Sequence, residues 1–139
     1  MALDVGDVRI GVAISDVEGR MAFPHSAVRR GEPDDIAQIV LLATEEGVKE
    51  IVVGMPLHLS GQPGAQAKEV RRFIKSLAAA TPTRIITLDE RYSSVQAQRM
   101  LRDSGEKPSR DKGRIDAAAA TVLLQAYLDA GRMRRRATP

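Results

Sequence analysis

The chain has 139 residues, of which 43% are apolar and 28% charged, a size and composition typical of one globular domain. No stretch approaches the roughly 20 apolar residues of a membrane span, and the absence of cysteine excludes disulfides, a thiol nucleophile and cysteine zinc sites. Because there are only two histidines, a bound metal would be a hard cation held by carboxylates. The N-terminus lacks the layout of a signal peptide, so we expect one cytoplasmic domain over residues 1–139.

The net charge of +3 is distributed unevenly along the chain. Residues 107–114 carry a formal charge of +3 and the last ten residues +4, so the remainder carries −4. An acidic body with a basic loop and a basic tail favours a polyanionic partner, and with only 3% aromatic residues we expect contacts to phosphates rather than stacked bases. A flexible, solvated end explains the tail, residues 131–139, equally well.

The first part of the chain predicts three strands. Short apolar runs over residues 2–6, 9–15 and 21–28 are separated by turns at Gly6-Asp7 and at residues 16–19. Tight turns join antiparallel neighbours, so these strands should form a meander.

Strands and helices then alternate. Strands are expected at residues 51–54 and 84–88, and loops at 55–64 and 104–113. Helices are expected at Pro33 to Gly47, from Ala65, from Ser93 or Ser94, and from Arg114 to Asp129. Strands separated by helices pair in parallel through crossovers, so the sequence predicts an α/β fold in which a mixed five-stranded sheet has helices on both faces.

Three carboxylates are candidates for a metal site. Asp4 lies inside a strand that should be buried, Glu90 follows the carboxyl end of a strand, and Asp116 lies in the first turn of a helix near its apolar side. Without matching buried bases these acids would repel one another, and bound Mg²⁺ or Mn²⁺ would relieve that repulsion. The alternative is that they are exposed turn or capping residues.

Other polar residues have competing interpretations. Asp16 is expected to form a turn. Arg9 is expected to pair with a carboxylate, with phosphate binding as a weaker alternative. Ser93 and Ser94 can cap a helix whose N-terminus could also face a phosphate. The basic loop leads into Asp116 and is the best candidate for substrate contact, against an ordinary connector; its basic residues are Lys107, Arg110, Lys112 and Arg114.

Four motifs in order resemble the YqgF/RuvX family of bacterial nucleases, which are related to the RuvC-type Holliday junction resolvases. They are Asp4-Val5-Gly6 with residues 9–16, Val53-Gly54-Met55-Pro56-Leu57, residues 89–94, and residues 112–120. The resemblance covers nearly the whole chain and implies an RNase H-like fold. One departure is that only three residues precede Asp4, so the first strand should be short at its start.

The resemblance also implies a function. It assigns the family's acidic triad to Asp4, Glu90 and Asp116, with Asp4 shared between two Mg²⁺ or Mn²⁺ ions in a phosphodiester hydrolase. The first hypothesis is a nuclease that processes the 5′ end of precursor 16S ribosomal RNA, acting as a monomer or homodimer. The alternatives are a Holliday junction resolvase acting as a dimer on branched DNA, and a nucleic-acid-binding ribosome-biogenesis factor without turnover.

Overall fold

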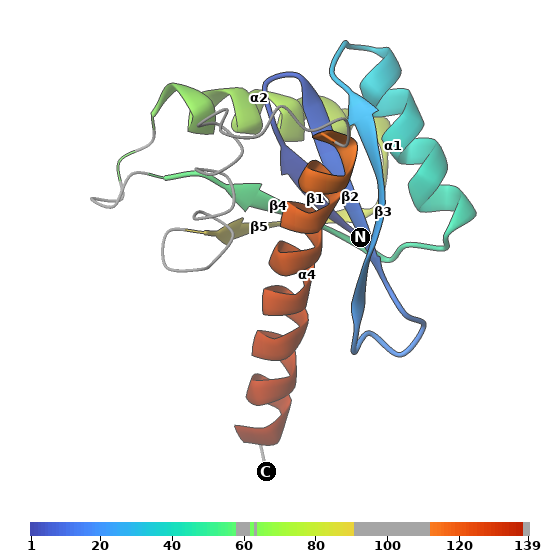
Figure 1. The fold of residues 1–139 in the computed structure, drawn as a ribbon, viewed down its shortest axis with the longest axis vertical. Helices are drawn as coiled ribbons and strands as arrows, with labels where there is room; N and C mark the ends of the chain where they lie inside the picture. The colour runs from blue at the N-terminus through green and yellow to red at the C-terminus, as the bar shows by residue number, and fades with distance from the viewer. Residues whose placement is uncertain (58–61, 63, 91–111, 138–139) are drawn as a thin grey trace.

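The computed structural model describes residues 1–57, 62, 64–90 and 112–137. Five strands form one mixed sheet in the order β3-β2-β1-β4-β5 (Figure 1). The strands β1 (Ala2–Val5), β2 (Arg9–Ser15) and β3 (Ala22–Arg29) pair antiparallel, while β4 (Glu50–Met55) and β5 (Arg84–Asp89) extend the sheet in parallel from β1. This arrangement confirms the predicted mixed five-stranded sheet and places the short β1 at its centre.

The turn between β2 and β3 explains Asp16. Its Oδ1 accepts the backbone N–H groups of Arg20 at 2.8 Å and Met21 at 3.3 Å, and Gly19 in the same turn has a φ of 68°. The Arg20 N–H is the largest of the influences that hold the pKa of the exposed Asp16 carboxyl below its ordinary value. Asp16 is therefore a turn-forming residue, as its position at the end of a strand predicted.

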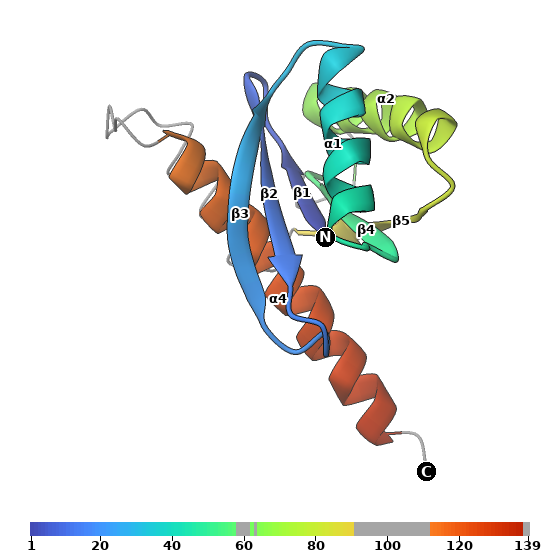
Figure 2. The same cartoon turned by 90° about the vertical axis from the view of Figure 1, so that its right-hand side faces the viewer.

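One face of the sheet is covered by two helices. The helices α1 (Asp34–Glu45) and α2 (Ala65–Ala80) lie on the same side of the sheet, opposite α4 (Figure 2). They bury alternate residues of the strands in a core of large apolar side chains, which includes Leu3, Val5, Ile10, Val12, Ile51, Val53, Ile39, Val70, Phe73 and Leu77. Apolar residues at every second strand position and at helical spacing form this face, as their pattern predicts.

Among the described residues, the other face packs against the helix α4 (Lys112–Ala137). The contact involves smaller residues, with Ala2, Ala13 and Val52 of the sheet against Ala120, Leu123 and Leu124 of the helix. Past this contact the C-terminal part of α4 projects beyond the sheet (Figure 1). Within the described ranges, no helix combines the length and apolar composition of a membrane span.

The ends of α4 differ from the prediction. We expected a helix from Arg114 to Asp129, but the helix also includes Lys112 and Gly113, which were expected in a loop, and residues 131–137, which were expected in a flexible tail. Ala, Met and Arg are strong helix formers, and Asp129 interacts with Gln125 at 3.0 Å and with Arg132 one turn away. These local interactions continue the helix through a segment whose charge alone suggested a solvated end. The helix expected from Ser93 or Ser94 lies outside the described residues.

Candidate active site

Four charged side chains are buried in the described part of the chain: Asp4, Asp35, Glu90 and Asp116, each at most 2% exposed. Burying a carboxylate is costly unless it has partners. Asp35 has a structural explanation at the start of α1, because it accepts the N–H groups of Ile36 at 2.7 Å and Gly31 at 3.1 Å and pairs with Arg30 at 3.5 Å. The other three are the residues that were predicted from the sequence as candidate metal ligands.

Asp4 lies in the middle of the sheet on the face that packs against α4. It pairs with Gly11 of β2, and because Leu3 pairs with Val53 of β4, the next residues along these parallel strands are Asp4 and Gly54. Neighbours in one row of a sheet point to the same face, so the Asp4 side chain has a glycine on each side of it in its row. That row gives the buried carboxylate space on both sides.

Glu90 occupies the space over Gly54. The position of a Cβ atom at Gly54 would be 2.5 Å from Oε2 of Glu90 and 3.1 Å from Leu123 of α4. The Glu90 side chain therefore lies above the row that contains Asp4, one residue after the end of β5. A side chain at position 54 would displace the Glu90 carboxylate from this place, and glycine permits the close approach.

Asp116 lies on the opposite side of Asp4, where α4 meets β2. A Cβ atom at Gly11 would be only 1.9 Å from the backbone oxygen of Asp116, so the helix packs directly on the backbone of the strand. Arg9 lies two residues before Gly11, on the same face of β2, and its Nε donates to Oδ2 of Asp116 at 2.8 Å. The pairing of Arg9 with a carboxylate is confirmed, and its partner is one of the three candidate acids.

The three acids are therefore brought to one row of the sheet from three separate parts of the chain. Glu90 lies over Gly54, Asp4 is central, and Asp116 packs against Gly11. Their oxygen atoms form the type of donor set that Mg²⁺ and Mn²⁺ prefer. Among residues 1–57, 62, 64–90 and 112–137, however, no three acidic or histidine side chains form a group ready to hold a cation. Asp116 instead pairs with the Arg9 guanidinium.

Most of the predicted substrate contacts cannot be placed. Ser93, Ser94, Lys107 and Arg110 lie outside the described residues. Lys112 and Arg114 belong to the first turn of α4, just before Asp116, so these two basic positions belong to the helix that carries a candidate acid.

Sequence reasoning missed the role of the two glycines. Gly11 and Gly54 were treated as ordinary members of their strands, whereas the structure shows that a methyl group at either position would collide with Asp116 or Glu90. The signal was present, because a glycine inside a strand pattern often marks a close approach of backbone or ligand. What the sequence alone does not show is that the two glycines flank Asp4 in one row.

Comparison with known proteins gives consistent matches over nearly the full length. Residues 1–130 match the model of a family described as "RuvX: Holliday junction resolvase". A Chloroflexus aggregans protein named "Putative pre-16S rRNA nuclease" is 48% identical over 133 residues, which are 95% of this chain and 94% of that protein. Proteins with the same name are 42% identical over 137 residues in Synechococcus elongatus, covering 98% of this chain and 92% of the relative, and 41% identical over 133 residues in Leifsonia xyli, covering 95% and 86%.

Proposed function

Because the chain belongs to the YqgF/RuvX family, we propose that it is a metal-dependent nuclease that processes the 5′ end of precursor 16S ribosomal RNA. The names of its relatives supply the substrate class. The observation that carries the chemistry is the set of buried carboxylates around the Gly11–Asp4–Gly54 row. The proposal places the protein in the cytoplasm with RNA as its partner, in one nuclease domain.

We assign the metal ligands to Asp4, Glu90 and Asp116. Carboxylate oxygens fit Mg²⁺ or Mn²⁺, and the central position of Asp4 suits a ligand shared by two ions. When bound, such ions stabilise the charge that develops on the attacking and leaving oxygens and lower the pKa of a coordinated water. In this mechanism no side chain of the protein acts as a nucleophile.

The protein contributes the orientation of the proposed ligands. Asp4 is fixed by the strand pairing on both sides, and Asp116 is fixed by the packing of α4 on Gly11. Arg9 donates to the Asp116 carboxylate and so compensates its charge while no cation is bound. We also propose that Ser93, Ser94, Lys107, Arg110, Lys112 and Arg114 contact the substrate.

The test compares the protein with Asp4→Asn on labelled RNA that carries the 5′ end of precursor 16S rRNA, with Mg²⁺ or Mn²⁺ present. The proposal predicts cleavage by the unchanged protein and by Asp34→Asn, an exposed acid on α1, but no cleavage by Asp4→Asn, which should still bind the RNA. Equal behaviour of the protein and Asp4→Asn would overturn the enzymatic proposal and favour a binding factor without turnover.

A second candidate substrate is branched DNA, because the family model that matches the chain carries the description of a Holliday junction resolvase. A four-way junction should be incubated beside the RNA under the same conditions. Paired, symmetric nicks and a dimer in light scattering would favour the resolvase, because a junction has two equivalent strands to cut. Cleavage of the RNA by a monomer would favour the first proposal.

A further inference from the structure

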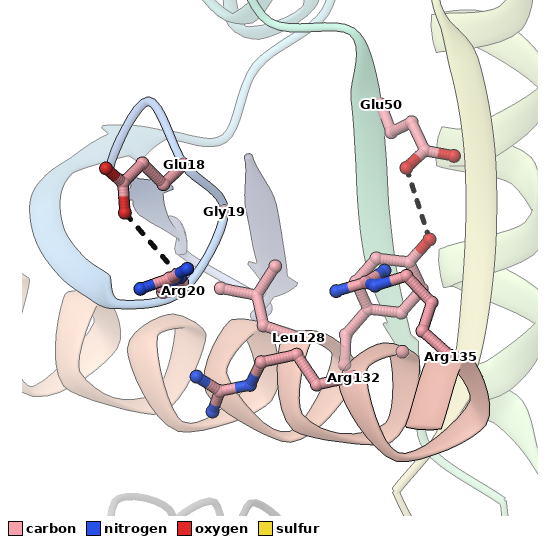
Figure 3. Close-up of a pocket in the computed structure, with 9 residues that line it drawn as sticks. Glu18, Gly19, Arg20, Glu50, Leu128, Arg132 and Arg135 are labelled. Atoms are coloured by element: carbon pink, nitrogen blue, oxygen red, sulfur yellow. Dashed lines mark hydrogen bonds and ion pairs between the residues drawn. The ribbon is translucent and has the colours of Figure 1, made fainter. Parts of the chain in front are cut away.

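A second feature lies at the opposite end of α4 from Asp116. The turn between β2 and β3 faces the projecting C-terminal part of α4, and the two border an open pocket of about 830 Å³ (Figure 3). We call it the hairpin–helix pocket. Its lining residues are Glu18, Gly19, Arg20, Glu50, Tyr127, Leu128, Gly131, Arg132 and Arg135.

The acidic groups of the pocket are paired within the protein. Glu18 pairs with Arg20 at 3.5 Å, and Glu50 accepts the Tyr127 hydroxyl at 3.3 Å and pairs with Arg84 at 3.4 Å. Two of these contacts are drawn in Figure 3. Arg132 in turn pairs with Asp129 one turn earlier on α4. The charged groups at the pocket are therefore four arginines, Arg20, Arg84, Arg132 and Arg135, against three acids, Glu18, Glu50 and Asp129, so the pocket carries a net positive charge of one.

Two of the lining arginines come from adjacent turns of one helix. The Arg132 side chain is 39% exposed, and Arg135 is exposed as well. A Cβ atom at Gly131 would be 3.5 Å from Nη1 of Arg135, so the guanidinium lies beside the helix at this position. The planar guanidinium donates two parallel N–H groups to phosphate oxygens, which makes arginine the preferred residue for this contact.

We propose that the hairpin–helix pocket binds the sugar-phosphate backbone of the RNA substrate away from the cleavage site. The inference rests on the proposed nuclease function. Asp116 and Arg132 are sixteen residues apart on the same helix, a separation of about 24 Å at ~1.5 Å per residue. At roughly 3.4 Å per phosphate along a duplex strand, that length corresponds to about seven nucleotides. The rigid helix therefore fixes the spacing between the bound backbone and the site that cuts it.

The test measures RNA binding without divalent metal, so that it does not depend on cleavage. Arg132→Gln/Arg135→Gln is compared with Arg71→Gln/Arg72→Gln, which removes the same charge from the exposed face of α2 on the opposite side of the sheet. We expect the first pair to weaken binding about 10-fold and to lower the slope of log affinity against log salt by about 1.5, since each phosphate contact contributes roughly 0.7–0.9. The α2 pair should leave both quantities unchanged.

Two further measurements sharpen the test. Arg132→Lys/Arg135→Lys keeps the charge but not the planar donors, so it should recover part of the affinity. Shortening the RNA below about seven nucleotides should remove the difference in RNA affinity between the unchanged protein and Arg132→Gln/Arg135→Gln. RNA of that length, when bound at the cleavage site, does not reach the pocket.

The inference and the proposed function fail separately. Unchanged RNA affinity and salt slope in Arg132→Gln/Arg135→Gln would overturn the pocket as an RNA site, and these arginines would then serve only the C-terminal end of the helix, where cations are favourable. Cleavage that still depends on Asp4 would leave the nuclease proposal intact in that case. Loss of RNA binding in a protein that cuts no RNA would support the pocket and contradict the nuclease.

Discussion

The two faces of the sheet differ in the size and polarity of their residues, and the difference is visible within β1. Leu3 points toward α1 and α2, into a core of large apolar side chains, whereas its neighbours Ala2 and Asp4 point toward α4. On the α4 face, glycine and alanine let the helix backbone approach the strands and leave space for buried acids. The large apolar core and the proposed metal ligands thus lie on opposite sides of the same strands.

The largest effect should come from the apolar face. Phe73 of α2 is fully buried there, and Phe73→Ala should lower the free energy of unfolding by about 3–5 kcal/mol, through lost burial and a cavity. Urea unfolding measures this loss. RNA cleavage per folded molecule should be unchanged, and a large loss of cleavage in the folded fraction would show that the two faces are not separate in function.

On the α4 face, adding one methyl group should affect both stability and activity. A Cβ atom at Gly11 would collide with the backbone of Asp116, which rotamer changes do not relieve, so Gly11→Ala should cost about 1–3 kcal/mol or more and displace a proposed metal ligand. The matched control is Gly131→Ala. There the new Cβ atom meets Arg135 at an ordinary 3.5 Å, so helix propensity should stabilise the protein by about 0.5–1 kcal/mol. Stabilisation by both changes would contradict the close packing of α4 on β2.

The ion pair between Arg9 and Asp116 gives a prediction about metal. Arg9→Gln removes one partner of a buried carboxylate and should lower the free energy of unfolding by about 1–3 kcal/mol in metal-free buffer. Mn²⁺ should then raise the melting temperature more in Arg9→Gln than in the unchanged protein, because the cation no longer competes with the guanidinium for the Asp116 carboxylate. An equal or smaller shift in Arg9→Gln would argue against Asp116 as a ligand. Arg72→Gln on α2 is the control.

The smallest effect concerns Tyr127, at the far end of the α4 face. Burial, and then the nearby Glu50 carboxylate that accepts its hydroxyl, raise the pKa of Tyr127 above its ordinary value. Folding therefore favours the protonated phenol, and this contribution is present below the ordinary tyrosine pKa of about 10 and is lost as the pH rises through the folded value. In a Tyr92→Phe background, the phenolate absorbance of Tyr127 should appear at lower pH when Glu50 is replaced by Gln than when Glu50 is present. An unchanged titration would exclude Glu50 as a cause.

Much of the fold follows from local patterns in the sequence. The strands at residues 9–15 and 84–88 and the helix from Ala65 were predicted within a residue or two, because each has a clear period of apolar residues and a glycine or proline at its border. The prediction for the C-terminal end of α4 was wrong because the arginines after Gly131 were interpreted by their charge, although arginine is also a strong helix former.

The candidate site was predictable only in part. A carboxylate inside a buried strand is unusual enough to select Asp4 from composition and pattern alone. Which residues flank Asp4 depends on the strand register and on where α4 crosses the sheet, and these are set by contacts between residues far apart in the chain. Gly11, Gly54 and the Arg9–Asp116 pair therefore became visible only in the structure.

The central claim is that Asp4, Glu90 and Asp116 together hold the cations that a nuclease requires. The most direct test is Mn²⁺ binding, measured by calorimetry, for the protein, for Asp4→Asn, Glu90→Gln and Asp116→Asn, and for the exposed control Asp34→Asn. The account predicts that the protein and the control bind Mn²⁺ alike, and that each of the other three variants binds at least 10-fold more weakly, about 1.4 kcal/mol. Mn²⁺ binding by Asp4→Asn that equals binding by the unchanged protein would contradict it.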